Sequence, residues 1–235
     1  MSHFFLKHRS LSMLLAVLYA LFSIWTLGMR ILSAFSETAA ASFTQAESIL
    51  SAILFLLLPC VLFFFSAHSC TANAKTAMYA GAAAKLMALA AYCISLYGAD
   101  AKDLLSLIFC LSLGSAVLEI LTFILTAVIL RKSRTEAACS WIAAASCALH
   151  HVIYLTELYA SLQLIGNGSV VKWLRILASA SNAEFFISII KGAACALVFI
   201  LLYEESNPAP STSQSSEAVN TEDFNEKNGS GKTEK

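Results

Sequence analysis

Seven ionisable or polar side chains lie inside long apolar stretches of the sequence, and their chemistry is the first clue to what the chain could do. They are two lysines, two glutamates, two histidines and a tyrosine: Lys85, Glu119, His150, His151, Tyr154, Glu157 and Lys191. An ionisable group near the centre of a bilayer costs about 2.5–3.5 kcal/mol on insertion scales, so it faces the bundle interior and takes a partner there. The two lysines and two glutamates balance in formal charge, which predicts ion pairs inside the membrane.

Position along the expected helices predicts which of these residues pair. Lys85 lies 13 residues before the short connection 98–103, and Glu119 lies 16 residues after it. At about 1.5 Å of rise per residue their depths differ by roughly 4–5 Å, which a lysine side chain can cover. Glu157 and Lys191 each lie eight residues from the nearer end of the expected helix. The sequence therefore predicts two intramembrane pairs, Lys85–Glu119 and Glu157–Lys191.

The histidines and the tyrosine add a polar stripe to one of these helices. His150, Tyr154 and Glu157 follow an i, i+4, i+7 spacing, which places them on one helix face, whereas His151 is turned about 100° from His150. Such a stripe could line a path for protons or a solute. It could equally supply hydrogen bonds that hold helices together, at about 0.6 kcal/mol per bond. The sequence leaves both interpretations open.

Motifs for catalysis, metal binding or nucleic-acid binding were sought and not found. The sequence has no H-E-x-x-H, G-x-S-x-G or G-x-x-x-x-G-K-[ST] pattern. Its seven cysteines show no C-x-x-C spacing and lie mostly in apolar runs, where cysteine acts as a small hydrophobic residue. No long basic run is present. We therefore expect no enzyme activity, no metal, no cofactor and no nucleic-acid partner.

The composition defines the class of protein that positions these residues. Of 235 residues, 58% are hydrophobic and only 13% are charged, whereas a soluble domain carries roughly 25% charged residues. Too little charge remains to cover a surface that faces water. The composition predicts a polytopic membrane protein, with the lipid bilayer as its surroundings.

Six apolar runs are long enough to cross a bilayer, which takes about 20 residues in a helix. The expected spans are 11–35, 49–67, 77–97, 104–130, 137–165 and 183–203. Uninterrupted apolar runs in these spans argue against a β-barrel, whose strands alternate in hydrophobicity. The predicted fold is an all-α bundle of six transmembrane helices. Pro59 is expected to kink the second helix because it has no backbone N–H.

The segments outside the spans predict the orientation. Basic residues of short loops favour the cytoplasm. Six of them fall on one side (Lys7, Arg9, Lys75, Arg131, Lys132 and Arg134) and three on the other (Lys102, Lys172 and Arg175), with Arg30 near the outer end of the first span. Both termini, 1–10 and 204–235, are therefore predicted to be cytoplasmic in a multi-pass protein of the cell membrane. Cleavage of the first helix as a signal peptide is the alternative, which its apolar length argues against.

Two further segments have their own character. Apolar residues recur at helical spacing in 170–178, which includes Trp173, and predict a short helix on the outer membrane surface. The tail 204–235 is polar, with two of the three prolines, and is expected to be disordered.

The buried charges and the stripe motivate a functional hypothesis. The leading interpretation is a small-solute or ion transporter, or a membrane subunit of one. The alternative is a non-catalytic membrane scaffold, sensor or assembly partner, in which the ion pairs only fix helix packing. A protein partner or a homo-oligomer is compatible with either. A cavity that reaches the charged residues would favour transport, and a sealed core would favour the scaffold.

Overall fold

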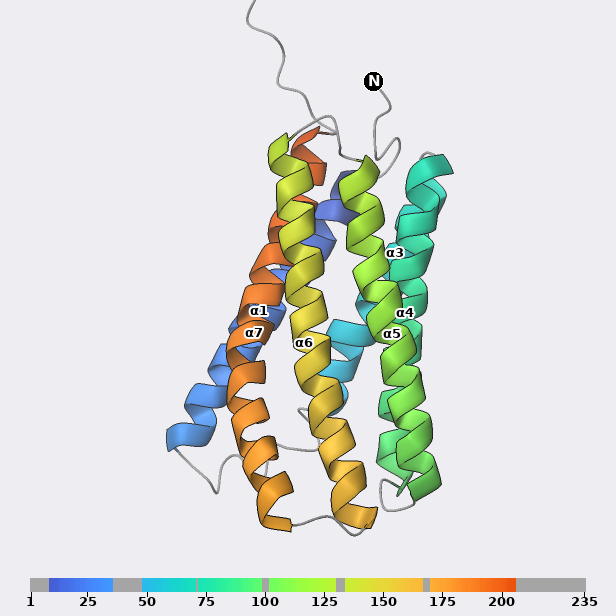
Figure 1. The fold of residues 1–235 in the computed structure, drawn as a ribbon. Coiled ribbons are helices and arrows are strands. Elements are labelled where there is room, and N and C mark those ends of the chain that lie inside the picture. The colour runs from blue at the N-terminus through green and yellow to red at the C-terminus, as the bar shows by residue number, and fades with distance from the viewer. Residues whose placement is uncertain are drawn as a thin grey trace, which may run out of the picture.

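The computed structural model of the chain describes residues 9–35, 48–70, 72–98, 102–129, 134–166 and 170–205, and these are the parts discussed below. Within these ranges the protein is all-helical, and six helices are long and apolar enough to cross a membrane. The prediction of an all-α protein with six candidate spans is confirmed (Figure 1).

Five of the spans are single helices and the second is interrupted. The single helices are α1 (Arg9–Phe35), α4 (Ala72–Gly98), α5 (Lys102–Ile129), α6 (Arg134–Gly166) and α7 (Val170–Glu205). The second span contains a π-helical turn, η1 (Ile53–Leu57), which leads into α3 (Leu58–Ser69). Most expected boundaries agree with these helices to within five residues.

The irregular turn in the second span lies next to Pro59. A proline inside a helix lacks the N–H that the preceding turn needs, and its ring clashes with the carbonyl four residues earlier. Here the chain widens before the proline, and the N–H of Leu58 bonds to the carbonyl of Ile53, five residues back. The sequence thus located the irregularity, and the π-helical turn is the form that it takes.

The sixth candidate span, Asn182–Glu204, agrees with the predicted 183–203, but the helix that contains it begins earlier. We expected a short helix at 170–178, a break, and a span at 183–203, but α7 runs unbroken from Val170 to Glu205. The sequence from Val170 to Lys191 contains no glycine or proline to end a helix. The serines and asparagine near 179–182 disfavour a helix by only a few tenths of a kcal/mol each. Of the predicted termini, 1–10 and 204–235, residues 1–8 and 206–235 lie outside the described residues.

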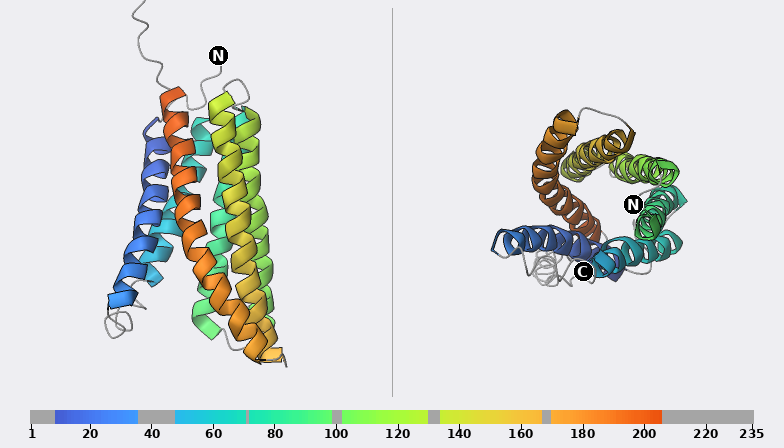
Figure 2. Two further views of the ribbon diagram at one scale, coloured as in Figure 1. Left: turned by 60° about the vertical axis from the view of Figure 1, so that its left-hand side comes forward. Right: turned by 90° about the horizontal axis from the view of Figure 1, so that it is seen from below.

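The six spans form a ring in which neighbours in sequence are mostly neighbours in space (Figure 2). α1 closes the ring by packing against α7, and its contact with the second span is the smallest between neighbours. The helices alternate in direction, so α1 begins and α7 ends at the same end of the bundle (Figure 1). We call this the terminal end, and the opposite end, where α4 ends at Gly98 and α7 begins, the distal end.

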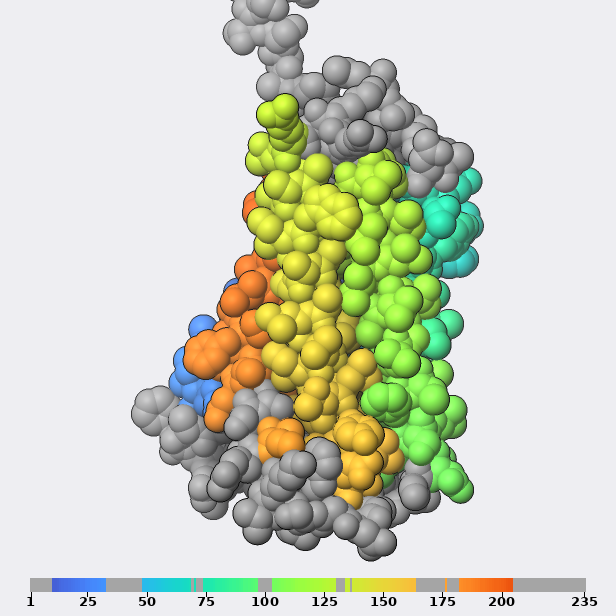
Figure 3. Space-filling view, in the orientation of Figure 1, coloured from blue at the N-terminus to red at the C-terminus, as the bar shows by residue number. Residues whose placement is uncertain are grey.

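Large apolar side chains cover the outside of the ring and also fill its terminal half. Exposed examples occur on every span and include Ile24, Phe65, Leu86, Val117, Ile142 and Phe186. Patches of this extent are unusual on soluble proteins and are expected where lipid surrounds a helix. Inside, the main buried cluster lies toward the terminal end. On the face shown in Figure 3, α5 and α6 pack side by side along their length.

Candidate functional site

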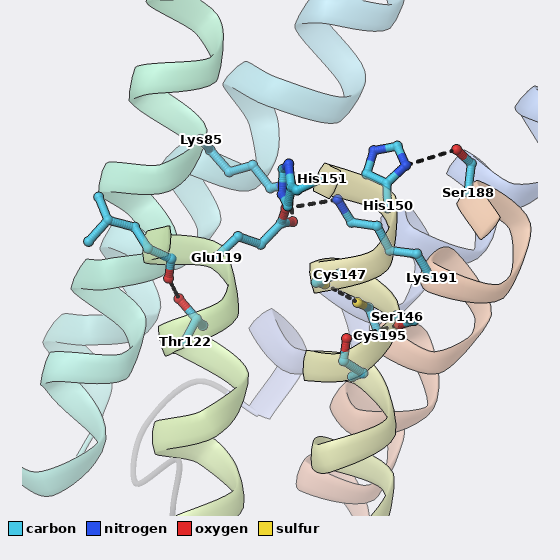
Figure 4. Close-up of polar contacts among 12 residues, drawn as sticks. Lys85, Glu119, Thr122, Ser146, Cys147, His150, His151, Ser188, Lys191 and Cys195 are labelled. Carbon is cyan, nitrogen blue, oxygen red and sulfur yellow. Dashed lines mark hydrogen bonds and ion pairs between the residues drawn. The ribbon is translucent and has the colours of Figure 1, made fainter. Parts of the chain in front are cut away.

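A buried carboxylate, Glu119 of α5, is the centre of the site. Lys85 of α4 donates to its Oε1 over 2.7 Å, and Lys191 of α7 donates to its Oε2 over 2.8 Å. His151 Nε2 of α6 lies 2.6 Å from Oε2, and the Tyr19 hydroxyl of α1 lies 3.4 Å from Oε1. Five helices therefore meet at one carboxylate, and we call these five residues the Glu119 cluster. Figure 4 shows the two lysines reaching Glu119 from opposite sides.

The protonation of His151 follows from its neighbour. A carboxylate only accepts hydrogen bonds, so the His151 Nε2 that faces Glu119 must carry a proton. Glu119, Lys85 and Lys191 are each less than one-tenth exposed. Because all three are buried, removing one charged partner would leave another charge unpaired, which costs several kcal/mol.

A glycine beside Lys191 allows α1 and α7 to approach closely. A Cβ atom at Gly192 would overlap Ser23 Oγ and would lie 2.8 Å from the Tyr19 carbonyl oxygen. The Ser23 hydroxyl also donates to the carbonyl of Ile189 over 3.0 Å, which ties the two helices together. This contact holds Tyr19 within reach of the cluster.

A cavity of about 840 Å³ extends from the Glu119 cluster toward the distal end of the ring. All six spans contribute to its wall, which includes Phe22, Arg30, Phe55, Tyr92, Ser95, Ser112, Ser115, His150, Tyr154, Glu184, Phe185 and Ser188. The wall residues farthest from the cluster include Arg30 and Ser95, whose side chains are exposed. The cavity is therefore reached from the distal end.

Aromatic side chains close the cavity on the terminal side. Tyr19 stacks on Phe199 with ring centroids 5.8 Å apart, and Phe63 and Phe123 meet Phe199 edge-on at 5.7 and 6.2 Å. The three phenylalanines are about 1% exposed and do not line the cavity. We call these four residues the aromatic plug. Its position means that the cavity ends at the charged cluster.

Of the two predicted ion pairs, one is present and one is wrong. Lys85 pairs with Glu119 as expected, but Lys191 pairs with Glu119 and not with Glu157. The error comes from the start of α7, because Lys191 lies 21 residues after Val170 while Glu157 lies nine before Gly166. The difference of 12 residues separates the two by about 18 Å along the helix axes.

Glu157 instead lies next to another carboxyl group. Its side chain lies close to Glu184 of α7, which lines the cavity. The Glu157 Oε1 atom is buried and has no hydrogen-bond partner among the described residues.

The predicted polar stripe of α6 is only partly assembled. His150 and Tyr154 line the cavity, and His150 Nδ1 lies 3.2 Å from the Ser188 hydroxyl. Glu157 does not line it, whereas His151, expected to point elsewhere, belongs to the Glu119 cluster. The cavity wall is therefore wider than one helix face.

Sequence reasoning missed Tyr19, Glu184 and Ser188 in this site. Tyr19 could have been noticed as a hydroxyl in the middle of the first span, one helical turn before Ser23. Ser188 lies three residues before Lys191 and so shares its helix face. Glu184 was placed at the end of the sixth span, where a charged residue needs no explanation.

Comparison of the chain with models of protein families, with curated proteins and with solved structures finds no match. Its function therefore has to be argued from the cavity and the cluster.

Proposed function

We propose that this chain is a small-solute transporter of the cell membrane, or the membrane subunit of one, and that the cavity is its solute site. The observation that carries the proposal is a cavity of about 840 Å³ that reaches a buried charged cluster from one end of the bundle. Ligand sites typically enclose about 300–1,000 Å³, with mostly apolar walls and a few convergent polar groups. The cavity fits this description.

We orient the protein with both termini in the cytoplasm and the distal end outside. The excess of basic residues at the terminal end supports this orientation. In this arrangement the cavity faces the outside, and the aromatic plug faces the cytoplasm. The first turns of α7, residues 170–178, then lie at the outer membrane interface, where a tryptophan such as Trp173 is common.

In alternating access, the solute site is open to only one side of the membrane at a time, and a cavity that opens at one end of the bundle fits this requirement. For a solute to pass, the contacts of the aromatic plug must open while the distal end closes. The smallest contact between neighbouring helices, between α1 and the second span, is a seam where such a movement costs least. Trp25 and Phe22 of α1 meet Phe55 there with ring centroids 6.3 and 5.3 Å apart.

A scaffold is the rival proposal, and one observation favours it. All four donors of the Glu119 cluster are directed at a carboxylate of the same chain, as in an arrangement that fixes helix packing. However, well-packed apolar residues would stabilise such a bundle at least as well as buried charges. A scaffold also has no need of an open cavity beside them.

Thiol labelling separates the two proposals. Ser112→Cys in the cavity wall, in a chain whose seven cysteines are replaced by alanine, would be treated with a membrane-impermeant reagent from each side in turn. A transporter predicts labelling from the outside and, more slowly, from the cytoplasmic side. Val117→Cys, on the lipid-facing surface of the same helix, is the control that should not be labelled.

The other outcomes decide against transport. Labelling of Ser112→Cys from the outside alone would indicate a one-sided receptor pocket. No labelling from either side would indicate the sealed core that the scaffold requires.

A further inference from the structure

The inner end of the cavity has more positive than negative charge. Lys85 and Lys191 share the single carboxylate of Glu119, one on each oxygen, at 2.7 and 2.8 Å. Two ammonium groups against one carboxylate leave one surplus positive charge among these three side chains. All three charged side chains are buried, and both lysines line the cavity.

The outer part of the wall does not offset this surplus. Its charged members are Arg30 and Glu184. The Arg30 guanidinium bonds to Asn182 Oδ1 over 2.8 Å and lies 5.8 Å from the centre of the Phe185 ring. Arg30 and Glu184 balance in formal charge, so the residues that line the cavity keep one positive charge.

The two lysines also have N–H donors beyond those that bind Glu119. Each ammonium group has three N–H donors, and Glu119 accepts one from each lysine. Serine hydroxyls of α5, at Ser112 and Ser115, line the cavity beside them. A second anion at this position would meet two ammonium groups and neutral hydroxyl donors.

Farther out, the wall is aromatic. Phe22 and Phe55 lie edge to face, with ring centroids 5.3 Å apart, and Phe185 and Tyr92 also line the cavity. These rings offer contact to an apolar body but no further charge. The volume of about 840 Å³ accommodates a molecule of this kind together with water.

We infer that the cavity binds a small organic anion, a carboxylate with an apolar body, whose carboxylate meets Lys85 and Lys191 and whose body lies against Phe22 and Phe55. The inference names the solute class of the proposed transporter and so rests on that proposal, but binding and flux are measured separately. The recognition is electrostatic at the inner end and apolar toward the mouth.

Binding of benzoate to the purified full chain in detergent tests the inference, with benzamide as the neutral compound of the same shape. We expect benzoate to bind at least about tenfold more tightly in calorimetry, since a hydrogen bond to a charged group is worth about that factor. Lys85→Met should abolish the preference. Lys75→Met, an exposed lysine at the terminal end of the same helix, is the control that should keep it.

A second pair of variants covers the case in which a lysine variant does not fold. Ser115→Asp adds a carboxylate to the wall one turn from Glu119, where the surplus charge stabilises it, and should remove benzoate binding. Ser115→Asn, of nearly the same size but neutral, is the matched variant and should bind benzoate more tightly than Ser115→Asp does. Equal binding of benzoate and benzamide, or equal binding by the two Ser115 variants, would overturn the inference.

Flux of labelled benzoate into proteoliposomes then separates the inference from the proposed function. Tight binding without flux would uphold the anion site and overturn transport. Labelling of Ser112→Cys from both sides, in a protein that does not distinguish benzoate from benzamide, would uphold transport and overturn the anion site.

Discussion

Removing Glu119 is expected to destabilise the protein more than removing either lysine that contacts it. In an isolated ion pair, loss of either partner leaves one unpaired charge, and the two losses cost about the same. Here one carboxylate accepts from both Lys85 and Lys191. Glu119→Gln leaves two ammonium groups facing each other, whereas Lys191→Met leaves an intact pair between Lys85 and Glu119.

The magnitudes follow from this difference. Removing one partner of a buried pair costs about 3–5 kcal/mol, and Glu119→Gln breaks two pairs, so the upper part of that range applies. Lys191→Met loses one charge-assisted hydrogen bond, worth about 1.5–3 kcal/mol. With about 2–4 °C for each kcal/mol in a domain of this size, we expect midpoints lowered by roughly 8–20 °C for Glu119→Gln and roughly 3–12 °C for Lys191→Met.

Thermal unfolding in one detergent, followed by circular dichroism, measures both variants under the same conditions. The double variant Glu119→Gln/Lys191→Met carries one unpaired ammonium group instead of two and should recover part of the loss. If Lys191→Met lowers the midpoint as much as Glu119→Gln does, the shared carboxylate is not the centre of the cluster and the reasoning fails.

Two further predictions concern packing and a buried thiol. Gly192→Ala should cost about 1–3 kcal/mol, because its Cβ would press α1 away from α7. Gly28→Ala, with no atom within 4 Å of the added carbon, should be neutral or stabilising in the same unfolding assay; equal losses would argue against the close approach. Cys70, between the second and third spans, has its pKa raised to about 12 by burial. Since the thiolate is the reactive form, iodoacetamide should modify it at pH 8 about a thousandfold more slowly than an ordinary thiol, and mass spectrometry before and after SDS unfolding measures this. The raised pKa also means that the protonated thiol favours the folded state below about pH 9 and that this contribution is lost as the pH rises toward 12; fast native labelling at pH 8 would contradict the burial.

The helices were predictable from the sequence because apolar length decides them. Each run of about 20 apolar residues has to satisfy its own backbone groups in lipid, which only a helix does for a single segment. The start of α7 was not predictable in this way. A polar stretch such as 179–182 ends an apolar run without ending a helix, so hydropathy gives the span Asn182–Glu204 but not the start of the helix at Val170.

The partners of the buried charges were predictable only where a short connection fixed the depth. α4 ends at Gly98 and α5 begins at Lys102, so counting from this turn brought Lys85 to the depth of Glu119. Counting cannot reveal how each helix is rotated about its axis. That rotation decides that Lys191, from two helices further along the chain, reaches the same carboxylate.

The position of the cavity, by contrast, follows from residue volume along single helix faces. On α5, the inward face passes through Ser112, Ser115, Glu119 and Phe123 at spacings of three or four residues. The two serines leave space for the cavity, Glu119 lies at its inner end, and the ring of Phe123 fills the next helical turn. α7 has a similar order from the distal end, with Ser188, Lys191 and Phe199, although Cys195 adds one turn between the charge and the ring.

Two helices that present small, charged and aromatic side chains in the same order will be hollow at one end and solid at the other when they face each other. Helix periodicity alone gives these faces, because residues three and four apart lie one above the other. The charged residues drew attention because they are costly in a membrane, but they say little about where space is left. The serines before them and the phenylalanines after them, which cost almost nothing in a bilayer, determine on which side of the charges the cavity lies.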